Sequence, residues 1–346
     1  MQIPGRWTWL FAAAVCGAVL ACSEFPTDVV GDDDTSSHSD DDSGGEADDP
    51  CGEPLDEQSG VADEDCTSTE PYELFDPQME LLWQWSDPVD EPEHFQVLSP
   101  PVVIDLDDDN GDGVIGSGDV PDVVFITMAD ECWNCDGLLR AVSGADGSEL
   151  WRDTSGRELP SGFGLAAGEI AEHSPGPEIV VKSEDPEILC YSASGQLLWN
   201  TPIDESTPSG AISLHDMDAD GEAEVIYGRV ILGADGTLHG VGEYGMGRVH
   251  DSFPLTYAVD LDDDGILEVI AGNAAYHKDG SALWTNGEQD GTTAVGDFDL
   301  DGDPEIVVSG YGTLRLQDHT GALIWGPIVT MGQTSNGAPP TVADFD

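Results

Sequence analysis

The stretch Asp297-Phe-Asp-Leu-Asp-Gly-Asp-Pro-Glu-Ile-Val-Val308 decides the fold of this chain of 346 residues. It carries carboxylates at relative positions 1, 3, 5 and 9 and a glycine at position 6, and β-branched residues follow. If the segment were extended, its first three carboxylates would share one face of a strand and repel one another. Glycine permits a turn with positive φ, which folds the segment so that the oxygens converge. Convergent hard oxygens suit Ca²⁺, which takes about 6–8 oxygen ligands.

The same spacing occurs in two further copies, each followed by Val and Ile. A solvated acidic turn explains one such copy, but a random acidic surface would not keep the spacing three times. We therefore predict metal binding at each copy. The chain ends on Asp344 and Asp346, which begin another copy. The predicted ligands of the three whole copies are Asp216, Asp218, Asp220 and Glu224; Asp260, Asp262, Asp264 and Glu268; and Asp297, Asp299, Asp301 and Glu305.

Two earlier copies depart from the pattern. In the copy between Glu169 and Glu178, Ala171 replaces the second ligand and one residue is inserted, so we expect it to keep its strands without its metal. The first copy is enlarged, and its insert has oxygen ligands at 1, 3 and 5, glycine at 6 and a carboxylate at 12, which is close to an EF-hand loop. The loop thus has two overlapping sets of ligands, and it could hold one ion or two. The first set is Asp105, Asp107, Asp109 and Asp122, and the second is Asp108, Asn110, Asp112 and Asp119. Asp119 stands where an EF-hand usually has Glu.

From about residue 79 the chain is one repeat array with a mean period of about 48 residues. Four short strands recur in each unit, and no helical period persists. Such periods indicate the blades of a β-propeller. We therefore predict an all-β fold, a β-propeller of four-stranded blades, with five near-complete blades and the start of a sixth. In the last unit the expected strands are 293–296, 305–308, 313–317 and 322–325.

The fourth strand of a unit has its own signature, an x-Gly turn followed by a tryptophan. It recurs at Trp151, Trp199, Trp284 and Trp325, which we expect to pack between neighbouring blades. Residues 80–85 match this strand although they precede the first acidic loop. We expect them to close a ring beside residues 340–344, in a chain that is a fragment of a longer one with six or seven blades.

The N-terminus carries export signals. Residues 1–21 form a predicted signal peptide, and Val19-Leu20-Ala21-Cys22 resembles the bacterial lipoprotein signal, in which the cysteine is lipidated. An ordinary signal peptide is the alternative. Ser23 follows, not the Asp that marks retention at the inner membrane, which favours the outer membrane. Residues 22–78 read as a disordered acidic linker, since residues 23–70 hold 18 Asp or Glu and no Lys or Arg.

Charge and cysteines narrow the function classes further. A formal charge of −62, with eight basic residues after the signal peptide, excludes nucleic-acid binding. It also disfavours adsorption to an anionic membrane, so any membrane contact is expected through the lipid alone. Disulfides are predicted for Cys51 with Cys66 and for Cys132 with Cys135, as suits an exported chain. Cys190 is expected to be a buried strand residue.

The three whole copies resemble the FG-GAP, or VCBS-type, repeats of integrin α-subunit propellers and many bacterial surface proteins. The resemblance covers about residues 80–346. It implies Ca²⁺ held by the side chains at positions 1, 3, 5 and 9 and by the carbonyl at position 7, which here belongs to Glu222, Ile266 and Asp303. Position 9 is Glu, where integrins commonly have Asp. Gly162-Phe163-Gly164 is the nearest trace of the Phe-Gly element.

The primary functional prediction is a non-enzymatic, calcium-binding, lipid-anchored propeller at the bacterial surface or in the periplasm, which binds a protein or a glycan. One alternative is a polysaccharide lyase or hydrolase, which needs a base or a carboxylate pair. His215, His250 and His277 are too scattered to indicate one. A quinoprotein is a second alternative, because the x-Gly turns that lead to a tryptophan are similar to the tryptophan-docking motif of quinoprotein dehydrogenases. A structural subunit of an outer-membrane assembly machine is a third. Fold does not decide among them.

Overall fold

The computed structural model describes residues 80–86, 88–129, 137–170, 175–205, 210–249, 252–330 and 338–343. All of them belong to the second of two compact units, Pro77–Asp346. The signal peptide, Cys22, the acidic linker, both predicted disulfides and the ligand candidates Asp344 and Asp346 lie outside the described residues. No helix in the described part of the chain is long and apolar enough to span a membrane.

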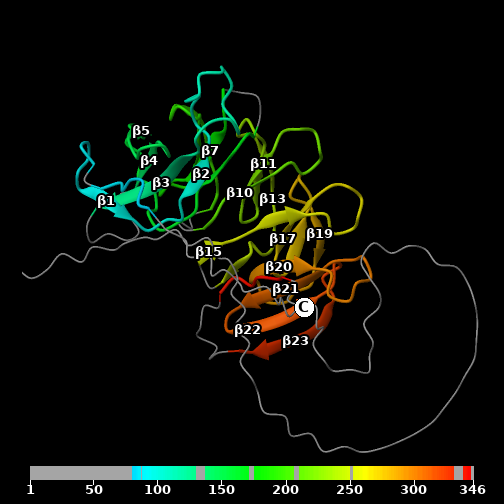
Figure 1. The fold of residues 1–346 in the computed structure, drawn as a ribbon. Coiled ribbons are helices and arrows are strands. Elements are labelled where there is room, and N and C mark those ends of the chain that lie inside the picture. Colours follow the sequence, from blue (N-terminus) through cyan, green and yellow to red (C-terminus); the bar gives the residue numbers. More distant parts are fainter. Residues whose placement is uncertain are drawn as a thin grey trace, which may run out of the picture. The chain divides into compact units, whose positions relative to one another are not determined.

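The described residues form six antiparallel sheets, of which five are the blades of a β-propeller, as the repeat array predicts, and one is a two-stranded hairpin (Figure 1). Within each of blades two to five the strands pair in chain order. Blade two contains β6 (Ala166–Gly168), β7 (Glu178–Lys182), β8 (Glu187–Tyr191) and β9 (Leu197–Pro202); blade three contains β10 (Ser213–His215), β11 (Glu224–Tyr227), β12 (Val230–Leu232) and β13 (Leu238–Val241); blade four contains β16 (Tyr257–Val259), β17 (Glu268–Ala271), β18 (Ala274–Tyr276) and β19 (Ala282–Thr285); blade five contains β20 (Thr292–Gly296), β21 (Glu305–Gly310), β22 (Thr313–Gln317) and β23 (Leu323–Val329).

Blade one divides its first strand into two pieces. The eight-residue β3 (Asp122–Ala129) pairs with β2 (Val102–Ile104) along its first half and with β1 (His94–Val97) along its second half. Pro100 and Pro101 separate the two pieces, because proline has no N–H to donate to a ladder. The blade is completed by β4 (Leu138–Val142) and β5 (Glu149–Arg152).

Each acidic loop joins the first strand of a blade to the second, and a tight turn joins the third to the fourth at the same edge. We call this edge the loop edge. The opposite edge, the link edge, carries the turns between second and third strands and the links from one blade to the next. The link from blade three to blade four contains a small extra hairpin, β14 (Arg248–Val249) and β15 (Ser252–Pro254).

The blades are held together by apolar side chains between neighbouring sheets. Four buried clusters join blades one and two, two and three, three and four, and four and five. The first strands β2, β6, β10 and β16 lie side by side in that order. Strand β7 is buried at all five positions, and β11, β12, β17 and β18 are buried throughout. This explains why their sequences are continuous Val, Ile and Ala runs and do not alternate.

Three of the four fourth-strand tryptophans pack between blades, as expected, whereas Trp325 in blade five is 39 % exposed. The indole N–H groups of Trp151, Trp199 and Trp284 each donate to a carbonyl in the third-to-fourth turn of the next blade, at 2.7, 3.0 and 2.8 Å. The rings lie on the turn glycines. A Cβ on Gly195 would come within 2.5 Å of the Trp151 ring, so this position excludes a side chain as well as having φ +77°.

Residues near the N-terminal end of the described chain use the same contact. Trp83 donates to the carbonyl of Gly144 at 2.7 Å and covers Gly147 in the turn of blade one. Residues 80–85 therefore act on blade one as a fourth-strand tryptophan acts on its neighbour. Their pairing with residues 340–344 remains a prediction. Cys190 lies in β8 as a free, buried cysteine, as the sequence suggested.

Candidate functional site

The three whole acidic loops have the same backbone, built by hydrogen bonds within each loop. The carboxylate at position 1 accepts the N–H groups of positions 5 and 6. For Asp216 these distances are 3.1 and 3.0 Å, for Asp260 3.2 and 2.9 Å, and for Asp297 3.2 and 3.0 Å. The loops therefore wrap around their first aspartate, as the spacing predicts.

Backbone dihedrals show where the loops turn. The residue at position 4 is left-handed in every copy, with φ of 57° at Ala219, 58° at Asp263 and 58° at Leu300. The glycine at position 6 follows with φ between 85° and 99°. Positive φ is uncommon for residues with a Cβ. The three copies thus share a specific conformation in which local strain is tolerated to bring the oxygens together.

The glutamate at position 9 begins the second strand and is buried. Its Oε2 accepts the N–H of position 2 at 2.9 Å in Glu224, 3.1 Å in Glu268 and 2.8 Å in Glu305. These three residues are at most 5 % exposed. Burial raises the pKa of Glu268, and Asp262 and Asp264 add to the effect. A buried carboxylate beside other carboxylates favours a bound cation.

The structure brings positions 1, 3 and 9 together in each of the three loops. In every group one ligand atom from each residue lies within 4.8 Å of the other two. The position-5 aspartates Asp220, Asp264 and Asp301 are not in these groups, and Oδ1 of each accepts the N–H of position 7. The residue types fit a hard cation. The groups are Asp216, Asp218 and Glu224; Asp260, Asp262 and Glu268; and Asp297, Asp299 and Glu305.

The enlarged first loop uses both of its predicted spacings. Asp108 accepts three N–H groups, from Gly111, Asp112 and Gly113, at 2.8–3.0 Å, and Asp119 accepts those of Asn110 and Gly116 at 3.3 and 2.9 Å. This is the EF-hand-like set.

The other ligand set of the first loop also keeps its backbone contact. Asp122 accepts the N–H of Leu106 at 3.0 Å, as position 9 does elsewhere. Oδ1 of Asp105 is buried with no hydrogen-bond partner, which fits a cation nearby. Burial and the carboxylates of Asp109, Asp119 and Asp108 raise the pKa of Asp107. Among the described residues this loop forms no three-ligand group within 4.8 Å, so the number of ions stays open.

The degenerate second loop keeps one part of the arrangement. Glu178, which is fully buried, still accepts the N–H of Ile170 at 3.2 Å. Residues 171–174 lie outside the described residues, so the predicted loss of the metal stays a prediction. The contact between positions 2 and 9 therefore belongs to the blade itself, since it occurs in all five blades.

Basic side chains meet two of the acidic groups. The Nζ atom of Lys278 lies 2.8 Å from Asp218 and 2.8 Å from Glu224 in the loop of blade three. The Nδ1 atom of His277 lies 3.6 Å from Oε1 of Glu268 in the loop of blade four, with 43 % of the His277 side chain exposed. The spacing of the acidic loops does not point to Lys278.

The link edge has a different chemistry. A cavity of about 280 Å³ opens there, with Arg229, Arg248, Tyr244, Tyr311 and Asn273 in its wall. Nε of Arg229 and Oδ1 of Asn273 are buried without a hydrogen-bond partner in the described structure. Tyr311 has φ +53°, a strained conformation for a bulky residue. We call this the link-edge cavity.

One carboxylate organises the link-edge cavity. Asp290 accepts N–H groups from Met246, Gly247 and Arg248 at 2.8–3.4 Å, and from Gly272 and Gly291 at 3.1 and 2.9 Å. It thus ties the link between blades three and four to a turn in blade four and to its own link. No spacing pattern in the sequence points to Asp290, because its partners lie up to 44 residues away.

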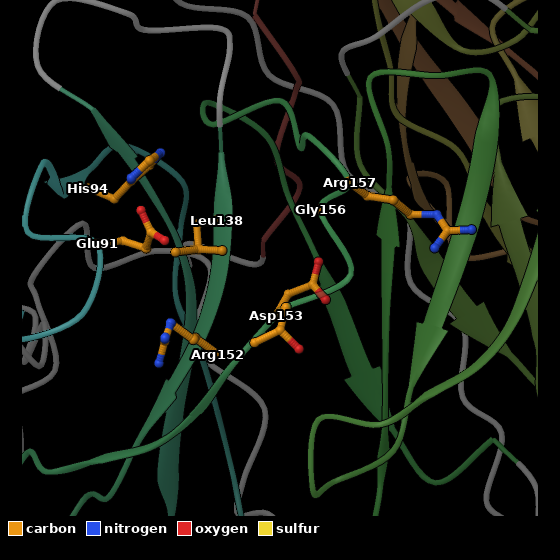
Figure 2. A pocket seen from close by; sticks show the side chains of 8 residues that line it. Glu91, His94, Leu138, Arg152, Asp153, Gly156 and Arg157 are labelled. Carbon is orange, nitrogen blue, oxygen red and sulfur yellow. The ribbon is translucent and has the colours of Figure 1, made fainter.

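A second link-edge pocket, of about 270 Å³, lies at blade one. Figure 2 shows Glu91, His94, Leu138 and Arg152 around it, while Arg157 points toward the strands of blade two, where it bonds Glu187 at 2.9 Å. Glu91, Glu93 and His94 also form a group of close ligand atoms. The two glutamates are exposed. No motif in the sequence indicates this group.

Comparison with known proteins supports the fold. A family model described as the outer membrane protein assembly factor BamB matches residues 135–240. No curated protein matches the chain. The V. cholerae biofilm matrix protein Bap1 is similar at 28 % identity and a TM-score of 0.64, over 75 % of this chain and 44 % of that one. The exotype rhamnogalacturonan lyase YesX is similar at 18 % identity and a TM-score of 0.51, over 68 % of this chain and 49 % of that one.

These similarities support the β-propeller fold, but each covers only part of a chain. The chain spans less than half the length of both solved proteins. The family match covers less than half of this chain. The β-propeller fold is therefore established, and the FG-GAP resemblance remains an interpretation of the acidic loops.

Proposed function

We propose that this chain is a calcium-stabilised β-propeller of the bacterial envelope that binds a protein or glycan and catalyses no reaction. The observation that carries the calcium part is the recurrence of one loop structure. Three loops fold identically and each gathers three carboxylates within 4.8 Å, one of them buried. Repeated, convergent carboxylates on a turn of fixed geometry suit Ca²⁺ better than a solvated surface does.

The envelope location rests on the sequence and on the relatives together. The lipoprotein-like Cys22 motif indicates an anchor, and the BamB family model describes an outer-membrane assembly factor. The biofilm matrix protein Bap1 supports a binding role outside the cell. Replacing Cys22 by Ser is expected to release the protein from membrane fractions. Continued sedimentation of that variant with membranes would contradict the lipid anchor.

The ligand part of the proposal rests on the link edge. In a chain so rich in carboxylates, four of the arginines line its cavities, namely Arg152, Arg157, Arg229 and Arg248. The link-edge cavity adds two tyrosines, an unpaired donor and an unpaired acceptor. A saccharide or an extended peptide can pack on aromatic rings and can form hydrogen bonds with both a donor and an acceptor.

The test combines calorimetry with a ligand screen. Titration of Ca²⁺ into the purified, metal-free protein should show binding, and Mg²⁺ should bind more weakly because it requires a tighter octahedral site. The calcium-loaded protein is then screened on a glycan array and by pull-down. Arg229→Gln and Arg248→Gln should weaken any captured ligand without changing calcium binding. Absence of calcium binding would overturn the first part, and capture that both variants retain would overturn the link-edge assignment.

A further inference from the structure

The cation that faces the acidic loop of blade three comes from the chain itself. Lys278 lies in the third-to-fourth turn of blade four and reaches back into the loop of blade three. Its Nζ is 2.8 Å from Oδ2 of Asp218 and 2.8 Å from Oε1 of Glu224, two of the three grouped ligands. We propose that the Lys278 ammonium group takes the place of a metal ion in this loop, an inference that rests on the proposed calcium binding of the other loops.

The position of Lys278 follows from a change in blade three. Fourth-strand tryptophans pair with the next-to-last residue of the third strand, as Trp199 does with Cys190 and Trp284 with Ala275. In blade three the residue paired in this way, opposite Ile231, is Gly240. Blade three is therefore the blade whose fourth strand has a glycine at the tryptophan position.

Without an indole ring, the turn of blade four comes down onto the backbone of β13. A Cβ built on Gly240 would lie 2.1 Å from the backbone of Asp279, and one on Gly280 would lie 2.5 Å from the backbone of Val241. In the other blades the ring separates these two backbones, since turn glycines such as Gly195 contact the tryptophan directly. The close approach carries the residue before the turn toward the loop of blade three.

The residue that arrives there is the one lysine of its set. Equivalent turn positions, two before the turn glycine, hold Ala193 in blade two, Ala234 in blade three and His319 in blade five. Among the described residues Lys278 is also the one Lys or Arg paired with a loop-edge ligand group. The absence of a ring at Gly240 thus lets the turn of blade four approach, and the Lys278 side chain then reaches the carboxylates of the blade-three loop.

The contacts match those of a structural cation. An ammonium group has three N–H donors and no acceptor, so it satisfies carboxylate oxygens as a small cation does. Glu224 keeps its Oε2 on the N–H of Met217 at 2.9 Å while its Oε1 bonds Lys278. Lysine is ordinarily charged at neutral pH, so this side chain offers a positive charge to both carboxylates.

The neighbouring loops lack this arrangement. In blade four the nearest basic group is His277, which is 43 % exposed and lies 3.6 Å from Glu268, beyond hydrogen-bond distance. In blade five no described basic side chain pairs with Asp297, Asp299 or Glu305. Three loops with the same ligand spacing thus divide into one closed by lysine and two that take metal.

The direct test counts calcium ions by isothermal titration calorimetry on the purified protein. Lys278→Met keeps the length of the apolar stem and removes the charge, so the variant should bind one Ca²⁺ more per chain than the wild type. Lys278→Arg keeps the charge and should bind the wild-type number. Adding Asp218→Asn to Lys278→Met should abolish the extra ion. An unchanged number in a Lys278→Met protein that does bind Ca²⁺ overturns this inference alone, and no binding in either protein overturns it together with the proposed function.

A second measurement does not require the Lys278 variant to fold. In the presence of chelator, Glu224→Gln removes a charge that Lys278 pairs with and should lower the melting temperature by several degrees. Glu305→Gln removes a charge that only repels its neighbours and should leave the melting temperature unchanged or raise it. Both variants keep an amide oxygen for the backbone N–H. Equal losses in the two variants would overturn the assignment of the lysine as the cation of blade three.

Discussion

The loop edge and the link edge of the same blades are built in opposite ways. At the loop edge the three whole acidic loops are closed by backbone hydrogen bonds between residues at most seven positions apart, such as those accepted by Asp297 and Glu305. At the link edge Asp290 alone collects N–H groups from segments 18 and 42–44 residues away. The first edge repeats from blade to blade, and the second differs at every blade. Local contacts therefore recur with the sequence pattern at the loop edge, whereas contacts over long sequence separations make the link edge differ between blades.

Calcium removal is the largest expected perturbation, and it acts on the loop edge. Each metal loop brings several carboxylates close together, and they repel one another without the ion. A free calcium concentration about 100 times the dissociation constant of a site adds ~2.7 kcal/mol to the free energy of unfolding. A chelator should therefore lower the thermal midpoint of unfolding by many degrees, measured by differential scanning calorimetry. An unchanged midpoint would contradict the metal assignment.

Single loop variants locate the metal. Asp299→Ala removes a grouped ligand in blade five, whereas Glu169→Ala changes the degenerate loop of blade two. The first variant should lose roughly 2–3 kcal/mol of calcium-dependent stability, and the second should lose little. Similar losses in both would show that the loops with metal are wrongly assigned.

Asp290→Asn perturbs the link edge by a comparable but calcium-independent amount. Asparagine offers one acceptor oxygen in place of two, so several of five N–H groups lose their partner. Each buried, unsatisfied donor costs ~1–3 kcal/mol, but these are partly exposed, so we expect a total of about 2 kcal/mol. Urea denaturation with chelator measures it. The exposed Glu243→Gln, on the same edge, is the matched control and should match the wild type. If calcium restored the lost stability, Asp290 would be coupled to the metal sites, which would contradict the separation of the two edges.

The tryptophan contacts should give a smaller effect that depends on the blade. Trp199→Phe loses the bond to Ala234 and part of the packing on Gly236, so we expect a loss of ~1–2 kcal/mol. Trp325, which is 39 % exposed, should tolerate the same change with less than about 0.5 kcal/mol. Chemical denaturation of both variants tests the difference. Equal effects would show that the contact to the next blade does not matter.

The smallest effect concerns Lys182, a buried lysine at the link edge. Burial lowers its pKa to about 8, although Asp185 and Glu187 oppose the change. The folded protein then releases this proton before the unfolded chain does. Because the unfolded state binds more protons between pH 8 and pH 9.5, stability should rise with pH there, by at most about 1.4 kcal/mol per unit. The slope should disappear in Lys182→Met, and a slope that persists would assign it to another group.

Much of the loop edge could be predicted from local spacing. The 1-3-5-6-9 pattern encodes contacts within one loop, so it predicted the turn and the strand that starts at Glu305. It also predicted that positions 1, 3, 5 and 9 converge, and the structure groups positions 1, 3 and 9 of these. The expected strand at 313–317 was confirmed residue for residue as β22. The packing of Trp151 and Trp284 between blades was also confirmed, because the x-Gly signature fixes both the turn and the ring that covers it.

The tertiary structure decided which side chains face each of the three acidic loops. Lys278 lies 60 residues from Asp218, and only the stacking of blade four on blade three brings them together. The sequence held a signal, since Gly240 stands where other units have tryptophan, but its consequence depends on how close two backbones come. Asp290 and the link-edge cavity depend likewise on segments from several blades. Local spacing determines a loop, whereas the neighbour that faces it is set by packing over long sequence separations.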